Sequence, residues 1–177
     1  MNVCIVSFSP RKSGNCAAIA ELLRSMHDGA RVFDFSEFRI VGCGDCGYVC
    51  FDGGGCPFSD DKESEILDAV IESDLTYFIV PNYCDFPCAA FFAFNERSCG
   101  YFRKNEAKLS AYLSAPKKFI VVSNTNRSNF ETAFSYHCDG EPDILFLSAK
   151  KFGKVSLAGD ILDGSEAADE VRRFAEQ

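Results

Sequence analysis

The chain has 177 residues, of which 47% are hydrophobic and 25% are charged, and this length predicts a single domain, residues 1–177, with its own core. The net charge of -8 argues against densely negative partners, so we expect neither nucleic acid nor a membrane surface to be bound. The sequence contains ten cysteines, and its first segment shows no secretory signal pattern. Together these features predict a reducing compartment, and we expect a cytoplasmic protein.

The chain opens with a predicted strand at residues 3–8, a polar loop, and a predicted helix at residues 15–27. The loop offers hydroxyls, Arg11, Lys12 and the free N–H groups of a helix N-terminus, which together suit an anionic group. The candidate phosphate ligands are Ser9, Arg11, Ser13, Gly14, Asn15 and Cys16. The alternative is an ordinary strand-to-helix turn in which Arg11 and Lys12 are only solvated.

Two better-known phosphate motifs do not account for this loop. The spacing of a P-loop, Gly-x-x-x-x-Gly-Lys-Ser/Thr, is absent from the sequence. A dinucleotide fingerprint is matched by Gly42, Gly44 and Gly47, but no helical pattern follows them and they lie among cysteines. The remaining interpretation is a monophosphate site, suited to a mononucleotide such as FMN.

Strand-like and helix-like segments alternate along the rest of the chain. The predicted strands are residues 3–8, 31–35, 75–80, 119–123 and 144–147, and the predicted helices are residues 15–27, 61–73, 87–99, 129–137 and 165–176, with Ser165 as the N-cap of the last. Several strands are continuously apolar, as expected for strands buried on both faces. This order predicts an α/β fold with a five-stranded parallel sheet covered by helices on both sides.

A cysteine-rich insertion, residues 42–58, follows the second predicted strand. Its four candidate metal ligands are Cys43, Cys46, Cys50 and Cys56. Their spacing is tighter than in structural zinc sites, which pair two Cys-x-x-Cys elements across a dozen or more residues. It is more similar to the cysteine runs that hold iron-sulfur clusters, and a [4Fe-4S] cluster is therefore one interpretation. Zinc, and free or disulfide-forming thiols, are the alternatives.

The helix predicted at residues 87–99 is apolar on nearly every side, with Phe91, Phe92 and Phe94 pointing in different directions. An apolar face of this kind predicts a homodimer, with a homotetramer as a further possibility. The alternative is that residues 124–140 of the same chain cover this helix.

The loop 9–15 after a first strand resembles the phosphate loop of the flavodoxin-like NADPH-dependent FMN reductases and of their relatives, the iron-sulfur flavoproteins. Later landmarks occur in the same order, namely residues 60–61 opening a helix, residues 81–83 closing a strand, and residues 94–97 ending a helix. The resemblance covers about the first hundred residues. It departs from the family at Phe8, which replaces a usual glycine, at Cys16, which replaces a usual hydroxyl residue, and in the three residues between Cys46 and Cys50.

The resemblance implies a flavodoxin-like, doubly wound three-layer fold with strand order 2-1-3-4-5, in which the ends of the first and third strands line one crevice. It places the flavin ring at the end of the third strand and the start of the next loop. The residues implied there are Pro81, Asn82, Tyr83, Cys84 and Phe86, with Ser123 and Asn124 after the fourth strand closing the third side.

The function expected from these features is an FMN-dependent NAD(P)H oxidoreductase. A reduced nicotinamide would deliver hydride to FMN, and a quinone, a free flavin or an iron-sulfur acceptor would take the electrons. No catalytic acid–base group of the protein is expected. The alternatives are an electron carrier that relays electrons from FMN and the cluster between proteins, and a flavin-free domain with a zinc or redox-sensing cysteine loop.

Overall fold

The computed structural model describes residues 1–53, 55–58, 60–125 and 129–177. Its sheet contains six strands, β1 (Val3–Ser7), β2 (Arg31–Asp34), β3 (Leu75–Tyr83), β4 (Phe86–Pro87), β5 (Lys117–Ser123) and β6 (Asp143–Ser148). Its helices are α1 (Asn15–Met26), α2 (Val49–Asp52), α3 (Glu63–Glu72), α4 (Ala89–Phe102), α5 (Glu106–Ser114), α6 (Phe130–Ser135) and α7 (Ser165–Glu176), with two 3₁₀ turns, η1 (Ala149–Phe152) and η2 (Ser156–Ala158).

Five of the strands form a parallel sheet in the order β2-β1-β3-β5-β6. This is the predicted order 2-1-3-4-5, because β4 is a short addition that does not belong to the parallel series. Strand β4 pairs antiparallel with the end of β3, so the sheet has six strands and not the predicted five. The turn between them, Cys84-Asp85, has positive φ at both residues, the backbone combination of a tight two-residue hairpin.

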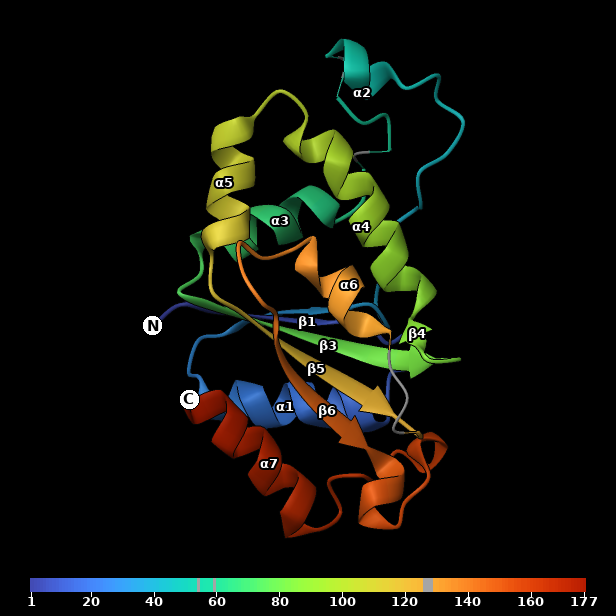
Figure 1. Ribbon diagram of the computed structural model, residues 1–177, viewed down its shortest axis with the longest axis vertical. Helices are drawn as coiled ribbons and strands as arrows, with labels where there is room; N and C mark the ends of the chain where they lie inside the picture. Colours follow the sequence, from blue (N-terminus) through green and yellow to red (C-terminus); the bar gives the residue numbers. More distant parts are fainter. Residues whose placement is uncertain (54, 59, 126–128) are drawn as a thin grey trace.

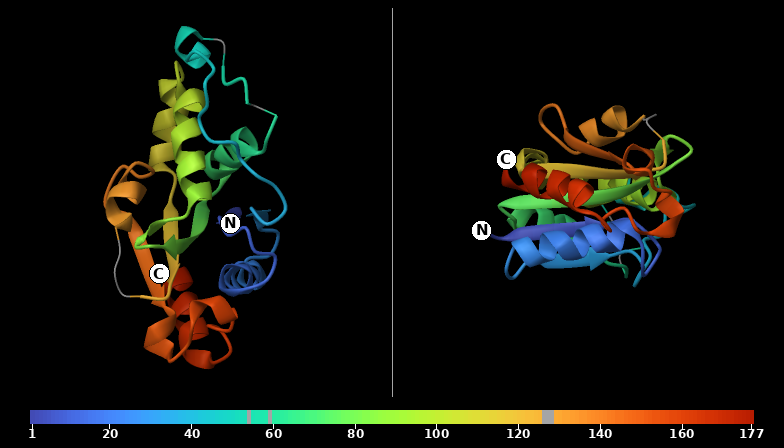
Figure 2. Two further views of the ribbon diagram at one scale, coloured as in Figure 1. Left: turned by 90° about the vertical axis from the view of Figure 1, so that its right-hand side faces the viewer. Right: turned by 90° about the horizontal axis from the view of Figure 1, so that it is seen from below.

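Helices cover both faces of the sheet, as the three layers of Figure 1 show. Helices α1 and α7 lie together on one face, which the view from below in Figure 2 presents. Helices α3, α4, α5 and α6 cover the other face, and α2 lies at the far end of α4, away from the sheet. This arrangement places the carboxyl ends of β1 and β3 at one edge, where the predicted site residues follow them.

The central strands β1, β3 and β5 are largely apolar because each contributes side chains to two separate cores. In β1, Ile5 packs toward α1 and α7, whereas Cys4 and Val6 pack toward the opposite layer. In β5, Ile120 and Phe119 divide in the same way. A strand buried on both faces has no solvent side on which polar residues could alternate. The continuous apolar runs of the sequence are therefore explained.

The predicted helices all exist, with boundaries that differ by a few residues, but the short helix α2 was not predicted, and two further details were wrong. Helix α5 was not predicted, since Tyr112 is its one buried residue in the structure and it therefore shows little apolar periodicity. It begins at Asn105, whose side chain accepts a hydrogen bond from the N–H of Lys108. Ser165 is the first residue of α7, and the N-cap position belongs to Gly164.

The apolar helix α4 is covered largely by its own chain. Phe91 and Phe94 are fully buried, and the Phe91 ring packs against Phe134 of α6 at 5.3 Å between centroids. The His137 ring stacks on Phe94 at 6.0 Å. Phe92 is the exception, since 37% of its surface is exposed. Most of the apolar surface of α4 therefore needs no second subunit to bury it.

In the part of the chain that the structure describes, no helix is both long enough and apolar enough to cross a bilayer.

Candidate functional site

The N-terminus of α1 has the properties of an anion site. Gly14 is the N-cap residue with φ 132, and no side chain caps the first N–H groups of the helix. The first turn also contains no acidic residue. The open N–H groups and the positive end of the helix dipole therefore face the loop without a protein anion to neutralise them.

Arg11 brings a full positive charge to the same place. A Cβ at Gly14 would lie 3.4 Å from the Arg11 guanidinium carbon, so the guanidinium lies directly over the helix N-terminus. Its Nη2 donates to the carbonyl of Leu157 at 3.1 Å, and no ion pair joins it to a carboxylate among the described residues. A bound anion would supply the negative charge that this guanidinium otherwise lacks.

The ends of β1 and β3 meet at this loop, as the sequence predicted. A cavity of about 70 Å³ lies between them. A water molecule occupies about 30 Å³ in the liquid, so the cavity suits a somewhat larger group, of the size of a phosphoryl. Nine of the predicted residues line it: Ser9, Arg11, Ser13, Gly14, Asn15, Cys16, Pro81, Asn82 and Tyr83. These residues therefore form one site, although they come from segments about seventy positions apart.

The other four predicted residues lie beside the cavity. Cys84 belongs to the tight turn and Phe86 to β4. Ser123 accepts a hydrogen bond from the side chain of Asn82 at 2.9 Å, and Asn124 accepts one from the N–H of Ser156 at 3.2 Å. Ser123 and Asn124 therefore position neighbouring groups of the cavity and do not line it.

The segment that covers the cavity was not among the predicted site residues. Ser156 and Leu157, in η2, supply its remaining wall together with Val122. Asn15 ties this segment down, since its Nδ2 donates to the carbonyl of Ser156 at 2.9 Å and its Oδ1 accepts the N–H of Ile161 at 2.9 Å. The side chain of Asn15 is therefore a structural clamp, and it contributes to anion binding through its place in the first turn of α1.

Close packing of two glycines fixes the height of this covering segment. A Cβ at Gly159 would lie 2.9 Å from the Cα of Gly14, and Gly159 also has φ +80. Any side chain at this position would push η2 away from the phosphate loop. Gly159 is therefore the one sequence signal of the segment, but its partner lies 145 residues earlier and cannot be identified from local pattern.

Two of the three departures from the family pattern lie near this site, and both leave the cavity open. The Phe8 ring is fully buried on the opposite side of the sheet, where it packs against Phe35 at 4.8 Å and Phe78 at 5.6 Å between centroids. Cys16 lines the cavity, and burial raises the pKa of its thiol to about 12. Cys16 is thus neutral at physiological pH and adds no negative charge against an anion.

The cysteine-rich insertion does not form a ready metal site. Cys43 is exposed, Cys46, Cys50 and Cys56 are half-buried, and the four lie around the short helix α2. Across the described ranges, no three side chains of cysteine, histidine, aspartate or glutamate are placed so that they could hold a metal ion. In the described part of the chain the four thiols are therefore not gathered around one centre, as a [4Fe-4S] cluster requires.

No family model and no curated protein matches the sequence. Solved structures do match the fold. They include the Trp repressor binding protein from Bacillus subtilis (TM-score 0.66, 15% identity, covering 97% of this chain and 96% of that one), the flavoenzyme NAD(P)H:(acceptor) oxidoreductase FerB from Paracoccus denitrificans (0.55, 12%, 99% and 95%), and the azoreductase AzrA (0.57, 10%, 100% and 100%). At these identities the likeness establishes the fold, which is flavodoxin-like.

Proposed function

We propose that this protein is an FMN-dependent oxidoreductase that takes electrons from NAD(P)H and passes them to a small acceptor such as a quinone or a free flavin. The observation that carries the proposal is the phosphoryl-sized cavity at the uncapped N-terminus of α1, beneath Arg11 and beside the end of β3. The names of two fold neighbours, an NAD(P)H:(acceptor) oxidoreductase and an azoreductase, agree with this chemistry.

The residues of the cavity fit the terminal phosphate of a mononucleotide. Arg11 and the N–H groups of the first turn of α1 would hold its oxygens, with the hydroxyls of Ser9 and Ser13 close by. Tyr83 is partly exposed at the rim, and burial raises the pKa of its phenol. This phenol stays protonated at physiological pH and can donate a hydrogen bond to a ligand. FMN, when bound, would supply the hydride and electron chemistry.

The protein's own contribution is binding and orientation. The covering segment at Ser156 shields one side of the phosphate from water, and Pro81 and Asn82 border the cavity along the end of β3. Because none of these groups needs to move a proton, no acid–base residue is required. This proposal also explains why the site contains one cation, a helix N-terminus and neutral polar side chains.

Replacing Arg11 by glutamine is expected to weaken FMN binding about 10- to 100-fold, since a hydrogen bond to a charged group contributes about 1.5–3 kcal/mol. Riboflavin, which lacks the phosphate, should bind the variant and the wild type equally. Flavin fluorescence titration of both ligands measures the two affinities. If riboflavin weakens as much as FMN, Arg11 does not recognise the phosphate, and the assignment of this cavity is wrong.

The reaction itself is tested with the purified protein loaded with FMN. We expect NADH or NADPH to be oxidised when a quinone or free flavin is added, and the rate to fall with the Arg11→Gln variant at limiting FMN. The electron carrier of the alternative interpretation would bind FMN without oxidising either nicotinamide directly. A protein that binds no FMN would contradict both.

Two further parts of the proposal concern assembly and location. A second copy of the chain would cover the exposed aromatic residues Phe86, Phe92 and Tyr136, which line a groove of about 460 Å³ on one side of α4 and α6. Light scattering of the purified protein would give the mass of a dimer or a tetramer. The cytoplasm, as a reducing compartment, suits the ten thiols, all of which are free in the structure.

A further inference from the structure

The cysteine-rich insertion is docked on the far end of α4 and on the turn that follows it. The guanidinium of Arg103 lies over the Phe51 ring at 3.9 Å from its centroid. The ammonium of Lys104 lies over Gly53, where a Cβ would be 2.8 Å from Nζ. These two contacts attach α2 to the turn that follows α4.

Two of the cysteines, Cys50 and Cys56, lie over the same glycine of α4, Gly100, and we call this place their shared seat. A Cβ built at Gly100 would lie 3.6 Å from the Cβ of Cys56, 3.7 Å from the Cβ of Cys50 and 3.9 Å from its Sγ. The glycine therefore leaves room for both residues over the same turn of the helix. A disulfide needs two β-carbons about 3.5–4.5 Å apart, so the loop would draw Cys50 and Cys56 together across Gly100, where no side chain stands between them.

A polar cavity of about 200 Å³ opens beside this seat. It is lined by Gly55, Cys56, Glu63, Ser64, Arg97, Gly100 and Tyr101. The side chains of Arg97 and Glu63 are 2% and 4% exposed, and Nε of Arg97 and Oε1 of Glu63 have no hydrogen-bond partner in the described part of the chain. Buried polar atoms without partners are rare, and here they flank a space large enough for a small polar molecule next to Cys56.

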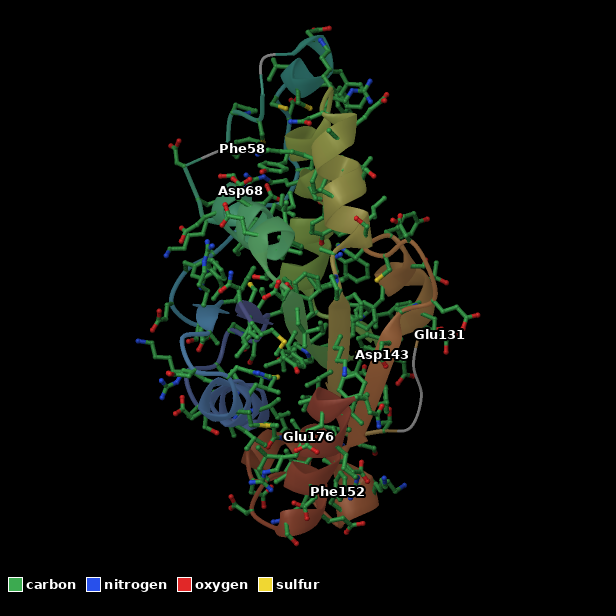
Figure 3. The ribbon with its side chains drawn as sticks, turned by 90° about the vertical axis from the view of Figure 1, so that its left-hand side faces the viewer. Phe58, Asp68, Glu131, Asp143, Phe152 and Glu176 are labelled. Carbon is green, nitrogen blue, oxygen red and sulfur yellow. The ribbon has the colours of Figure 1, made fainter. Side chains whose placement is uncertain are left out.

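Phe58, the last residue of the insertion, completes the attachment. Its carbonyl accepts a hydrogen bond from Nη2 of Arg97 at 2.6 Å, and Figure 3 shows Phe58 in the same half of the molecule as Asp68 of α3, far from Phe152 and Glu176. The site is therefore separate from the phosphate cavity, which lies at the edge of the sheet between α1 and η2.

We propose that Cys50 and Cys56 form a redox-active dithiol that a small hydroperoxide, entering the cavity beside Cys56, oxidises to a disulfide across Gly100. In the first step the sulfur of Cys56 attacks one peroxide oxygen, the O–O bond breaks, and Cys56 becomes a sulfenic acid as the other oxygen leaves as water or an alcohol. In the second step the sulfur of Cys50 attacks that of Cys56 and releases water.

The balance of this reaction is two thiols and one hydroperoxide giving one disulfide, one water and one water or alcohol. The polar groups of the cavity suit both steps, since the Nε–H of Arg97 has no partner among the described residues and can donate to the leaving oxygen as it develops negative charge. The disulfide would join two residues of the insertion and so close a loop within it, directly above α4. The proposal does not depend on the FMN site, and either can fail without the other.

The test uses the purified full-length protein, prepared anaerobically and treated with one equivalent of hydrogen peroxide. We expect peptide mapping to find a Cys50–Cys56 crosslink and thiol titration to show the loss of two thiols. Cys43→Ser, the matched control, should still form the crosslink. Cys50→Ser should instead leave Cys56 as a sulfenic acid that a dimedone probe captures. Gly100→Val, which fills the seat, should slow crosslinking at least 10-fold while leaving the number of thiols unchanged.

Three results would overturn the proposal. The first is a crosslink from Cys56 to Cys43, Cys46 or Cys99 in place of Cys50. The second is oxidation of Cys56 without any crosslink in the wild-type protein. The third is stoichiometric iron and sulfide in the anaerobically purified protein that is lost on replacing Cys50 or Cys56, because these thiols would then be cluster ligands.

Discussion

Replacing Arg97 by methionine is expected to lower the free energy of unfolding by about 3–5 kcal/mol, the cost of leaving a buried charge without its partner. The Arg97 side chain is 2% exposed and is paired with both Asp61 and Glu63. It also donates to the carbonyls of Phe58 and Val41. In the variant, the Asp61 carboxylate would lose its ion pair and the carbonyls of Phe58 and Val41 would lose their hydrogen bonds from Arg97. The attachment of the insertion to α4 would be weaker as a result. Urea unfolding followed by circular dichroism measures the change.

The matched control is Arg172→Met on α7. Arg172 pairs with Asp169 on the surface, where both side chains are nearly half exposed, and exposed pairs contribute about 0–1 kcal/mol. Glu63→Gln is a second comparison, because burial outweighs the attraction of Arg97 and raises the pKa of Glu63 to about 8. A neutral amide should therefore be tolerated much better there than the loss of Arg97. Equal losses for Arg97→Met and Arg172→Met would contradict the expectation.

Acidification from pH 7 to pH 4 is expected to destabilise the fold by about 3 kcal/mol through His137 alone, at about 1.4 kcal/mol for each unit between its two pKa values. Burial lowers the pKa of His137 to about 3, and the positive charge of Lys117 adds to the effect. The unfolded chain has the ordinary value near 6.5. Between these values the unfolded state binds the extra proton, so stability falls as the pH decreases through this window.

The environment of His137 explains the size of the shift. The ring is 1% exposed, lies among Phe78, Phe91 and Phe94, and pairs with Tyr112 through Nδ1 at 2.7 Å. Its Nε2 has no partner among the described residues. A charged imidazolium here would lose its hydration without compensation.

The measurement compares wild type with His137→Gln at several pH values. Glu63 titrates in the opposite sense, since its folded pKa is raised to about 8 and stability from this group is lost as the pH rises from about 4.5. The difference between the two proteins cancels that contribution. We expect the advantage of the wild type to shrink by about 1.4 kcal/mol for each unit of acidification below 6.5. A difference that does not change with pH would show that His137 stays uncharged in both states or charged in both.

The parts of the fold that were predicted correctly depend on local patterns. Strand-like runs, several of them continuously apolar, marked the five parallel strands, and helix-like stretches between them marked α1, α3, α4, α6 and α7. Helix α5 was missed because its buried surface consists mainly of Tyr112. The β3–β4 hairpin was missed because Cys84 and Asp85 have positive φ without the glycine or asparagine that usually announces such a turn.

The candidate site divides in the same way. The residues of the loop 9–16 and of β3 that line the cavity lie at the ends of strands that the family resemblance placed side by side, so their meeting could be expected. The covering segment could not, because it depends on Asn15 binding Ser156 and Ile161, and on Gly14 meeting Gly159. The shared seat of Cys50 and Cys56 depends on Gly100, which lies on a helix that the sequence marks only as apolar.

The sequence by itself determined the layered α/β architecture and the loop that carries the candidate anion ligands, because periodicity and helix-terminus chemistry are encoded within a few neighbouring residues. The strand order was implied by the family resemblance. Only the tertiary structure decided how large the cavity is, which segment closes it, and which cysteines lie together. These properties result from contacts between segments far apart in the chain, and such contacts depend on how layers pack, which no local pattern contains.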